Sequence, residues 1–173
     1  MSEKFVAILM GSDSDYGTME PAVEILKSFD IKFEVKVTSA HRTPMETMNY
    51  VKKAEERGCA VFICAAGLAA HLAGAVAANT TCPVIGVPIN CGPLNGIDAL
   101  LSTVQMPGGI PVATMAIGKA GAKNAAYFAV QILAVSDPEL MNKFRMDRIR
   151  NADAVNRKNE ALQSRIHGEK VFD

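Results

Sequence analysis

The sequence predicts an α/β fold in which helices cover both faces of a parallel sheet. Two observations support this fold class. Short apolar runs alternate with segments of helical periodicity, and the central runs are apolar throughout, which is typical of strands buried on both faces. The 173 residues can form one domain with its own core. Five strands with intervening helices fit a flavodoxin-like three-layer sandwich, with a five-stranded parallel sheet in the order 2-1-3-4-5.

The expected elements follow one another in regular alternation. We expect strands at Phe5–Met10, Lys32–Val37, Ala60–Ala65, Val84–Val87 and Pro111–Ile117. We expect helices at Tyr16–Phe29, 44–58, His71–Asn79, Ile97–Gln105 and Ala120–Val135. The second helix begins at Thr43-Pro44, with Thr43 as the capping residue and a proline suited to the first helical position.

The C-terminal segment differs in character from the rest of the chain. Asp137 and Pro138 open an expected helix that ends near Ile166 and spans roughly 40 Å. Its apolar stripe is interspersed with charges, a pattern typical of a helix that packs against another subunit or a neighbouring domain. We therefore expect a flavodoxin-like domain that holds the catalytic site, 1–136, and a C-terminal helical extension, 137–173, that acts as an inter-subunit arm.

Composition excludes several classes of partner. Lysine plus arginine equals aspartate plus glutamate at 18 each, so the chain lacks the basic surface that nucleic-acid binding requires. No stretch reaches the roughly 20 apolar residues of a membrane span, and the first apolar run is too short for a signal peptide. The four cysteines form no C-x-x-C pair. We expect them to be reduced packing residues in a cytoplasmic protein.

The fold class also predicts where a ligand binds. In open α/β sheets, ligands bind beyond the carboxyl ends of the strands, near the point where the strand order reverses. This rule brings together three loops that follow the first three strands: Gly11–Asp15, Thr38–Thr43 and Ala66–His71. These loops contain serine, aspartate, histidine and arginine side chains that can bind a ligand or react with it.

The first loop reads GSDSD and suits an anion next to a sugar. Gly11 permits a tight turn, and Ser12 and Ser14 offer hydroxyls beside a helix N-terminus, where backbone N–H groups favour negative charge. Asp15 can accept hydrogen bonds from ribose hydroxyls. Helix capping by Ser14 or Asp15 is the alternative interpretation, which needs no ligand.

The second loop reads SAHRTP and adds acid–base chemistry. Arg42 presents a planar fork that matches phosphate geometry, and Ser39 adds a hydroxyl. His41 has an imidazole, the side chain best suited to exchange protons near neutral pH. Its position beside an arginine at the end of a strand favours a catalytic role over that of a solvated surface group.

The third loop reads AAGLAAH, and its small residues leave space for a planar ring against the backbone. Its successive N–H groups can bind carboxylate or phosphate oxygens. His71 either contacts the ligand or begins the next helix with its ring in a local hydrogen bond; the sequence leaves both open. The chain has no G-x-G-x-x-G, no P-loop and no G-x-S-x-G motif, which disfavours dinucleotide, P-loop and serine-hydrolase chemistry.

Four motifs, in this order, resemble those of the class I N5-carboxyaminoimidazole ribonucleotide mutases, the family once called the catalytic subunit of phosphoribosylaminoimidazole carboxylase. They are GSDSD at 11–15, SAHRTP at 39–44, AGLAAHLAG at 66–74 and LLSTVQMPGGIPVATMAIGKAGAKNAA at 100–126. The resemblance runs from about Val6 to Ser136 and does not include the C-terminal helix.

The resemblance implies an isomerase of purine (IMP) biosynthesis that acts on a small phosphoribosyl aminoimidazole. Such an enzyme moves a carboxylate from the exocyclic nitrogen to the adjacent ring carbon by decarboxylation and recarboxylation. The resemblance also implies a homo-octamer that needs no metal or organic cofactor, and it leaves functional coupling to the ATP-dependent N5-carboxyaminoimidazole ribonucleotide synthetase open. It implies that His41 is the general acid and base. With His71 added from its place in the third loop, the expected substrate-binding residues are Ser12, Ser14, Asp15, Ser39, Arg42, Gly67, Ala70, His71 and Leu72.

The chain departs from the family pattern at two positions, and two alternative functions stay open. Leu68 stands where the family commonly has glycine, and Ala73 where it has proline, which bears on affinity and turnover more than on reaction type.

The first alternative is a direct carboxylase of aminoimidazole ribonucleotide that uses carbon dioxide. Such relatives tend to carry lysine after the loop histidine, where this chain has Arg42. The second is a non-catalytic flavin- or nucleotide-binding module, which the lack of aromatic residues in the ligand loops disfavours.

Overall fold

The computed structural model describes residues 4–168. The chain divides into two compact units, one that runs to Leu133 and one that begins at Ala134. The outermost residues of the two expected domains, 1–3 and 169–173, lie outside the described residues. The role of the second unit as an inter-subunit arm stays a prediction.

The first unit is built on a five-stranded, all-parallel sheet in the order β2-β1-β3-β4-β5. This confirms the predicted fold class and strand order. The strands are β1 (Phe5–Met10), β2 (Phe33–Val37), β3 (Cys59–Ala66), β4 (Val84–Pro88) and β5 (Ala113–Thr114). The helices of this unit are η1, a 3-10 turn (Asp13–Asp15), α1 (Tyr16–Ser28), α2 (Pro44–Glu56), α3 (Leu72–Ala77), α4 (Ile97–Val104) and α5 (Lys119–Ala134).

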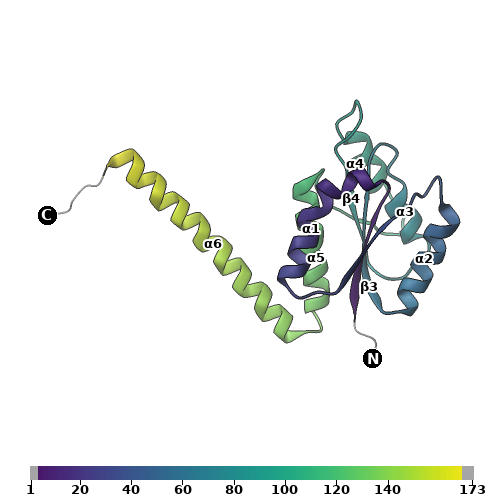
Figure 1. Ribbon diagram of the computed structural model, residues 1–173, viewed down its shortest axis with the longest axis horizontal. Helices are drawn as coiled ribbons and strands as arrows, with labels where there is room; N and C mark the ends of the chain where they lie inside the picture. The colour runs from purple at the N-terminus through teal and green to yellow at the C-terminus, as the bar shows by residue number, and fades with distance from the viewer. Residues whose placement is uncertain (1–3, 169–173) are drawn as a thin grey trace. The chain divides into compact units, whose positions relative to one another are not determined.

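The central strands are buried because helices cover both of their faces. Every residue of β1 is buried. On one face, Ala7, Leu9 and Phe62 pack in a cluster with residues of α2 and α3, and Figure 1 shows these helices on the opposite side of the sheet from α1 and α5. A side chain on Gly86 of β4 would collide with Thr103 of α4 and touch Ala73 of α3, so α4 lies on the same face as α3.

The last strand is much shorter than expected. The sequence predicts a strand over Pro111–Ile117, but β5 contains only Ala113 and Thr114. As an edge strand it has one neighbour, β4, and pairs with it through Ile85 and Gly86. The proline at its predicted start has no N–H to donate, which limits pairing on that side.

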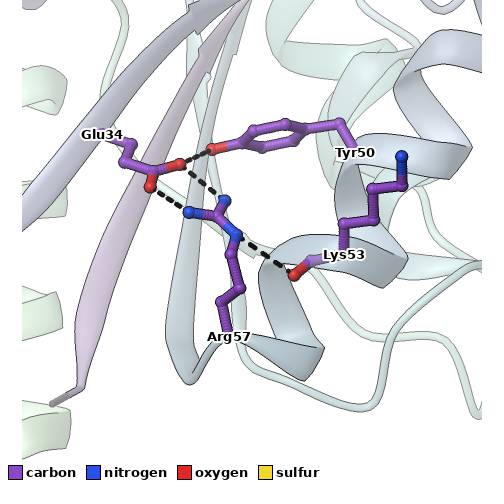
Figure 2. A network of polar contacts seen from close by, with 4 residues as sticks. All are labelled: Glu34, Tyr50, Lys53 and Arg57. Carbon is purple, nitrogen blue, oxygen red and sulfur yellow. Dashed lines mark hydrogen bonds and ion pairs between the residues drawn. The ribbon is translucent and has the colours of Figure 1, made fainter. Parts of the chain in front are cut away.

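A polar network ties β2 to α2, the two elements that flank the second loop (Figure 2). Arg57, the residue that follows α2, donates two hydrogen bonds to the carboxylate of Glu34 on β2, one of them at 2.8 Å. The hydroxyl of Tyr50 on α2 donates to the same carboxylate at 2.8 Å, and the Arg57 side chain also donates to the Lys53 carbonyl at 3.3 Å. The network joins the first residues of β2 to the C-terminal half of α2, at the end of both elements away from the second loop.

The second unit is dominated by the helix α6 (Pro138–His167), which confirms the long C-terminal helix. Asp137 caps it by accepting a hydrogen bond from the N–H of Leu140 at 3.0 Å, and Pro138 occupies its first turn, as expected. Large apolar side chains remain exposed along it: Met146, Ile149, Val155, Leu162 and Ile166. Within residues 4–168, no helix combines the length and the apolar character needed to cross a membrane.

Candidate functional site

The three loops predicted from the strand order surround one open cavity of about 270 Å³. A cavity of this size suits a small ligand. Its lining includes eight of the ten predicted site residues: Ser12, Ser14, Asp15, Ser39, His41, Gly67, His71 and Leu72. The cavity therefore lies at the carboxyl edge of β1, β2 and β3, where the switch in strand order places it.

The first loop folds into a capping box that begins the 3-10 turn. The side chain of Ser12 accepts the N–H of Ser14 at 3.3 Å, while the N–H of Ser12 donates to the Asp15 carboxylate at 3.1 Å. Capping therefore accounts for part of this motif: Ser12 caps the 3-10 turn, whereas Asp15 is the N-cap residue of α1 but makes no side-chain cap hydrogen bond to it. The hydroxyls of Ser12 and Ser14 lie 2.8 Å apart on the cavity wall.

Asp15 is the carboxylate that lines the cavity, and 9% of its surface is exposed. Burial raises the pKa of this carboxyl, and the neighbouring charge of Asp13 raises it further, while the hydrogen bond from the Ser12 backbone opposes them. One oxygen is held by that hydrogen bond. A carboxylate fixed in this way is positioned to accept hydrogen bonds from a ligand's hydroxyl groups.

The second loop is held in shape by threonine hydroxyls. Thr43 is the N-cap residue of α2 and a proline follows it, as expected, but its hydroxyl makes no cap hydrogen bond. Instead it accepts the N–H of Ser39 at 3.0 Å and lies 3.2 Å from the Ser39 carbonyl. Beneath it, the hydroxyls of Thr38 and Thr47 lie 2.6 Å apart in a buried pair. These contacts fix the turn that carries His41.

The third loop brings His71 against His41. Nε2 of His41 lies 2.7 Å from Nδ1 of His71, and the two rings meet edge to face at an interplanar angle of 80°. His71 is also the N-cap residue of α3. It therefore begins that helix, which is one of the two roles that the sequence left open. Its ring, however, bonds a residue 30 positions away rather than a local group.

Two predicted residues do not line the cavity. Arg42 is exposed beside His41, and its backbone N–H donates to the Ser39 hydroxyl at 3.1 Å. Ala70 is 2% exposed, and its N–H donates to the hydroxyl of Ser102 on α4 at 3.1 Å. The N–H of His71 donates to the Ala69 carbonyl at 2.9 Å, so two of the N–H groups expected to bind a ligand are already used.

Sequence reasoning missed several residues of the site. Cys91, expected to be a packing residue, lines the cavity against Gly67, where a side chain would meet its sulfur at 2.1 Å. Cys91 follows β4, so the carboxyl-edge rule applied to the fourth strand would have found it. The remaining lining residues are Gly11, Ala40, Ala66, Leu68 and Ala69.

A second cavity, of about 530 Å³, precedes β4 and β5 at the opposite ends of the strands. Its lining includes Thr80, Cys82 and Ile110 but no histidine, carboxylate or basic group. Of these two cavities, the smaller one has the histidines and the carboxylate that general acid–base chemistry would need. Among residues 4–168, no three histidine, cysteine or acidic side chains gather in a way that could hold a metal ion.

Comparison with known proteins agrees with the sequence motifs. The family model described as AIR carboxylase matches residues 5–154. The chain is 57% identical over 140 residues to the N5-carboxyaminoimidazole ribonucleotide mutase of Saccharolobus solfataricus, which covers 81% of this chain and 87% of that protein. It is 49% identical over 168 residues to the mutase of Mycobacterium leprae, covering 97% and 96% of the two chains. With the mutase of Escherichia coli K12 the identity is 51% over 150 residues, covering 87% and 89%.

The fold is shared with a solved structure. A crystal structure of Treponema denticola PurE superposes with a TM-score of 0.82 at 30% identity, covering 92% of this chain and 98% of that one. The family match spans both the three ligand loops and the strands that carry them. This chain belongs to the AIR carboxylase family.

Proposed function

We propose that this protein is a mutase that converts N5-carboxyaminoimidazole ribonucleotide into 4-carboxyaminoimidazole ribonucleotide in purine biosynthesis. The observation that carries the proposal is the meeting of three loops around one cavity with His41 and His71 in contact. The relatives named as mutases, at 49–57% identity, support the same reaction.

The reaction needs one proton to be given and one to be taken back. In the first step the bond between the exocyclic nitrogen and the carboxylate carbon breaks, carbon dioxide leaves, and His41 protonates the nitrogen. In the second step the electron-rich ring carbon attacks the carbon dioxide, and His41 removes the proton from that carbon. His41 ends in its starting form, which is why a single imidazole can serve as both acid and base.

His71 is the hydrogen-bond partner of His41. A hydrogen bond between two imidazole nitrogens requires a proton on one of them and a lone pair on the other. Nε2 of His41 and Nδ1 of His71 lie 2.7 Å apart, so one of these nitrogens carries the proton and the other accepts it. The proton can move from one ring to the other.

The other loops supply binding groups for a phosphoribosyl ligand. The hydroxyls of Ser12, Ser14 and Ser39 suit phosphate oxygens, and Asp15 suits the ribose hydroxyls. Arg42 is exposed and follows His41, a lining residue of the cavity, and its guanidinium suits an incoming phosphate.

Apart from His71, the third loop contributes apolar residues to the cavity wall. Gly67, Ala69 and Leu72 line the cavity there, and Ala70 lies buried behind them. Holding carbon dioxide beside the ring replaces a bimolecular capture with an effectively intramolecular one, an advantage of about 7–11 kcal/mol at best.

The runner-up function is direct carboxylation of aminoimidazole ribonucleotide. A mutase and a direct carboxylase accept different substrates. The purified protein is therefore offered either the N-carboxylated isomer or aminoimidazole ribonucleotide with bicarbonate. A mutase consumes the first without added bicarbonate, whereas a direct carboxylase consumes only the second. An inert, yellow preparation with flavin absorbance would instead support the non-catalytic module.

We further propose that the enzyme works as a homo-octamer in the cytoplasm, without metal or organic cofactor. Exposed apolar side chains on and beside α4 support self-association: Leu94, Ile97, Leu101 and Val104. The exposed apolar residues of α6 support the role of that helix as an inter-subunit arm. The chemistry of the substrate calls for an ATP-dependent synthetase to supply it, and functional coupling to that enzyme is part of the proposal. Sedimentation of the purified chain tests the subunit number.

A further inference from the structure

The loop between Gly67 and His71 carries one member of the histidine pair, so its conformation sets the distance between the two rings. The loop begins where β3 ends and stops where α3 begins. His41 is held independently by the second loop. Since a hydrogen bond weakens steeply with distance and angle, a small displacement of the third loop would break the 2.7 Å contact.

Ser102 on α4 lies within hydrogen-bond distance of the backbone of this loop. Its hydroxyl lies 2.6 Å from the Asp98 carbonyl of its own helix, 3.1 Å from the N–H of Ala70 and 3.4 Å from the Leu68 carbonyl. A hydroxyl has one proton to donate, and the short contact to Asp98 claims it. The hydroxyl oxygen is then aimed to accept from Ala70, the residue directly before His71.

The backbone of the loop needs this support. Leu68 adopts a φ of +55°, in the left-handed region that a leucine rarely occupies. Its side chain lies over Gly92, where an added Cβ would come within 2.4 Å of a leucine methyl. In the described part of the chain, the side chain outside the loop that hydrogen-bonds its backbone is Ser102. The strained turn is thus held by packing on one side and by one hydroxyl on the other.

We propose that Ser102 is a positioning residue for the His41–His71 pair: by holding the N–H of Ala70, it keeps His71 at hydrogen-bond distance from His41. Ser102 does not line the cavity, so it acts through the loop rather than on the ligand. The consequence for turnover rests on the proposed function, whereas the consequence for the histidine rings does not.

The test compares four forms of the full-length protein. Ser102→Ala removes the acceptor, Ser102→Cys keeps a side chain of similar size but replaces the hydroxyl with a poor acceptor, and Ser102→Thr keeps the hydroxyl. Ser28→Ala is the matched control, because Ser28 makes the same kind of intrahelical bond, to Ile25 at 2.8 Å, on α1. Each variant is first checked for cooperative thermal unfolding.

The first readout is the state of the imidazole nitrogens. The chain has three histidines, so long-range proton–nitrogen NMR spectra can be assigned with single His→Asn variants. We expect Ser102→Ala and Ser102→Cys to lose the signature of a hydrogen bond between the rings of His41 and His71, and Ser102→Thr and Ser28→Ala to keep it. Unchanged spectra in both Ser102→Ala and Ser102→Cys would overturn the proposal, and the cysteine variant carries the test if the alanine variant does not fold.

The second readout separates turnover from binding. We expect kcat for N5-carboxyaminoimidazole ribonucleotide to fall about 10-fold to 100-fold in Ser102→Ala with little change in KM, because misplaced reacting groups slow the chemical step. Ser102→Thr should restore most of it. A threonine variant as slow as the alanine variant would contradict the role of the hydroxyl. If the unmodified protein does not isomerise the substrate, the proposed function fails, but the NMR spectra still decide the role of Ser102.

Discussion

Nε2 of His41 and Nδ1 of His71 lie 2.7 Å apart, although 30 positions separate these residues in the chain. The contact joins the loops that follow β2 and β3, and it faces a cavity that the loop after β1 completes. It gives the proposed acid–base group, His41, a second imidazole as its hydrogen-bond partner.

The first prediction concerns His71. Replacing His71 with asparagine removes the ring that faces His41 but leaves the groups proposed to bind phosphate and ribose. We expect kcat to fall about 10-fold to 100-fold with KM for the nucleotide within a few-fold of its original value. Steady-state kinetics of the isomerisation check this. A rise in KM at unchanged kcat would instead mean that His71 binds substrate and does not serve His41.

The second prediction concerns the packing of the third loop on the segment after β4. A Cβ at Gly67 would meet the sulfur of Cys91 at 2.1 Å, so Gly67→Ala should destabilise the fold by about 1–3 kcal/mol. Adding Cys91→Ala removes the clashing atom and should recover part of this loss, which is non-additive behaviour. Urea unfolding measures both effects.

The matched control for that substitution is Gly17→Ala. Gly17 lies in α1, and an added Cβ there meets no atom within 4 Å. Alanine should therefore stabilise the helix by up to about 1 kcal/mol. If Gly67→Ala proved as harmless as Gly17→Ala, the close approach of the third loop to Cys91 would be wrong.

The third prediction concerns Arg42. Arg42→Ala removes the positive charge next to His41, and we expect KM for the nucleotide to rise about 10-fold to 100-fold, the effect of losing a hydrogen bond to a charged group. Lys52→Ala, which removes an exposed charge from α2, is the control and should leave KM unchanged. Equal KM values for the two variants would remove Arg42 from the phosphate site.

The fourth prediction concerns stability at low pH. The hydrogen bonds that Arg57 donates hold the pKa of Glu34 at about 2, below its usual value of 4.5, and the Tyr50 hydroxyl contributes in the same direction. A carboxyl with a lowered pKa in the folded state stabilises the protein above pH 4.5, and this contribution disappears as the pH falls toward 2. Because the pair is partly exposed, the effect is small.

Thermal unfolding of Glu34→Gln across this pH range tests the network. We expect a Tm about 2 °C below that of the unmodified protein at pH 7, and a difference that shrinks between pH 5 and pH 2. The exposed Glu56→Gln is the control and should show no such trend. A difference for Glu34→Gln that is independent of pH would indicate a packing effect instead of lost charge.

The strands and the place of the site could be predicted because their signals are local. The apolar run at Phe5–Met10 has no polar residue to place toward solvent, which requires burial on both faces, and the strand order then determines which loops share an edge. The shortness of β5 could not be predicted in this way. Its hydrophobic residues resemble those of the other strands, but only one neighbour is available to pair with it.

The contacts that shape the loops escaped prediction because residue type alone does not decide which partner a hydroxyl bonds. Thr43 has the right type and place for a cap, yet its hydroxyl bonds Ser39. Ser102 lies inside a helix, where a serine normally bonds its own helix, and nothing in the sequence indicates that its oxygen also accepts from Ala70. Positions such as these are decided by tertiary packing.

The most direct test of the central claim is the His41→Asn variant, with His167→Asn on α6 as the control. Isomerisation of N5-carboxyaminoimidazole ribonucleotide and calorimetric binding of the product nucleotide are measured on the same preparations. We predict that His41→Asn loses at least about 100-fold in turnover while the nucleotide Kd stays within a few-fold, and that His167→Asn behaves like the unmodified protein. Turnover near the unmodified rate in His41→Asn would contradict the account.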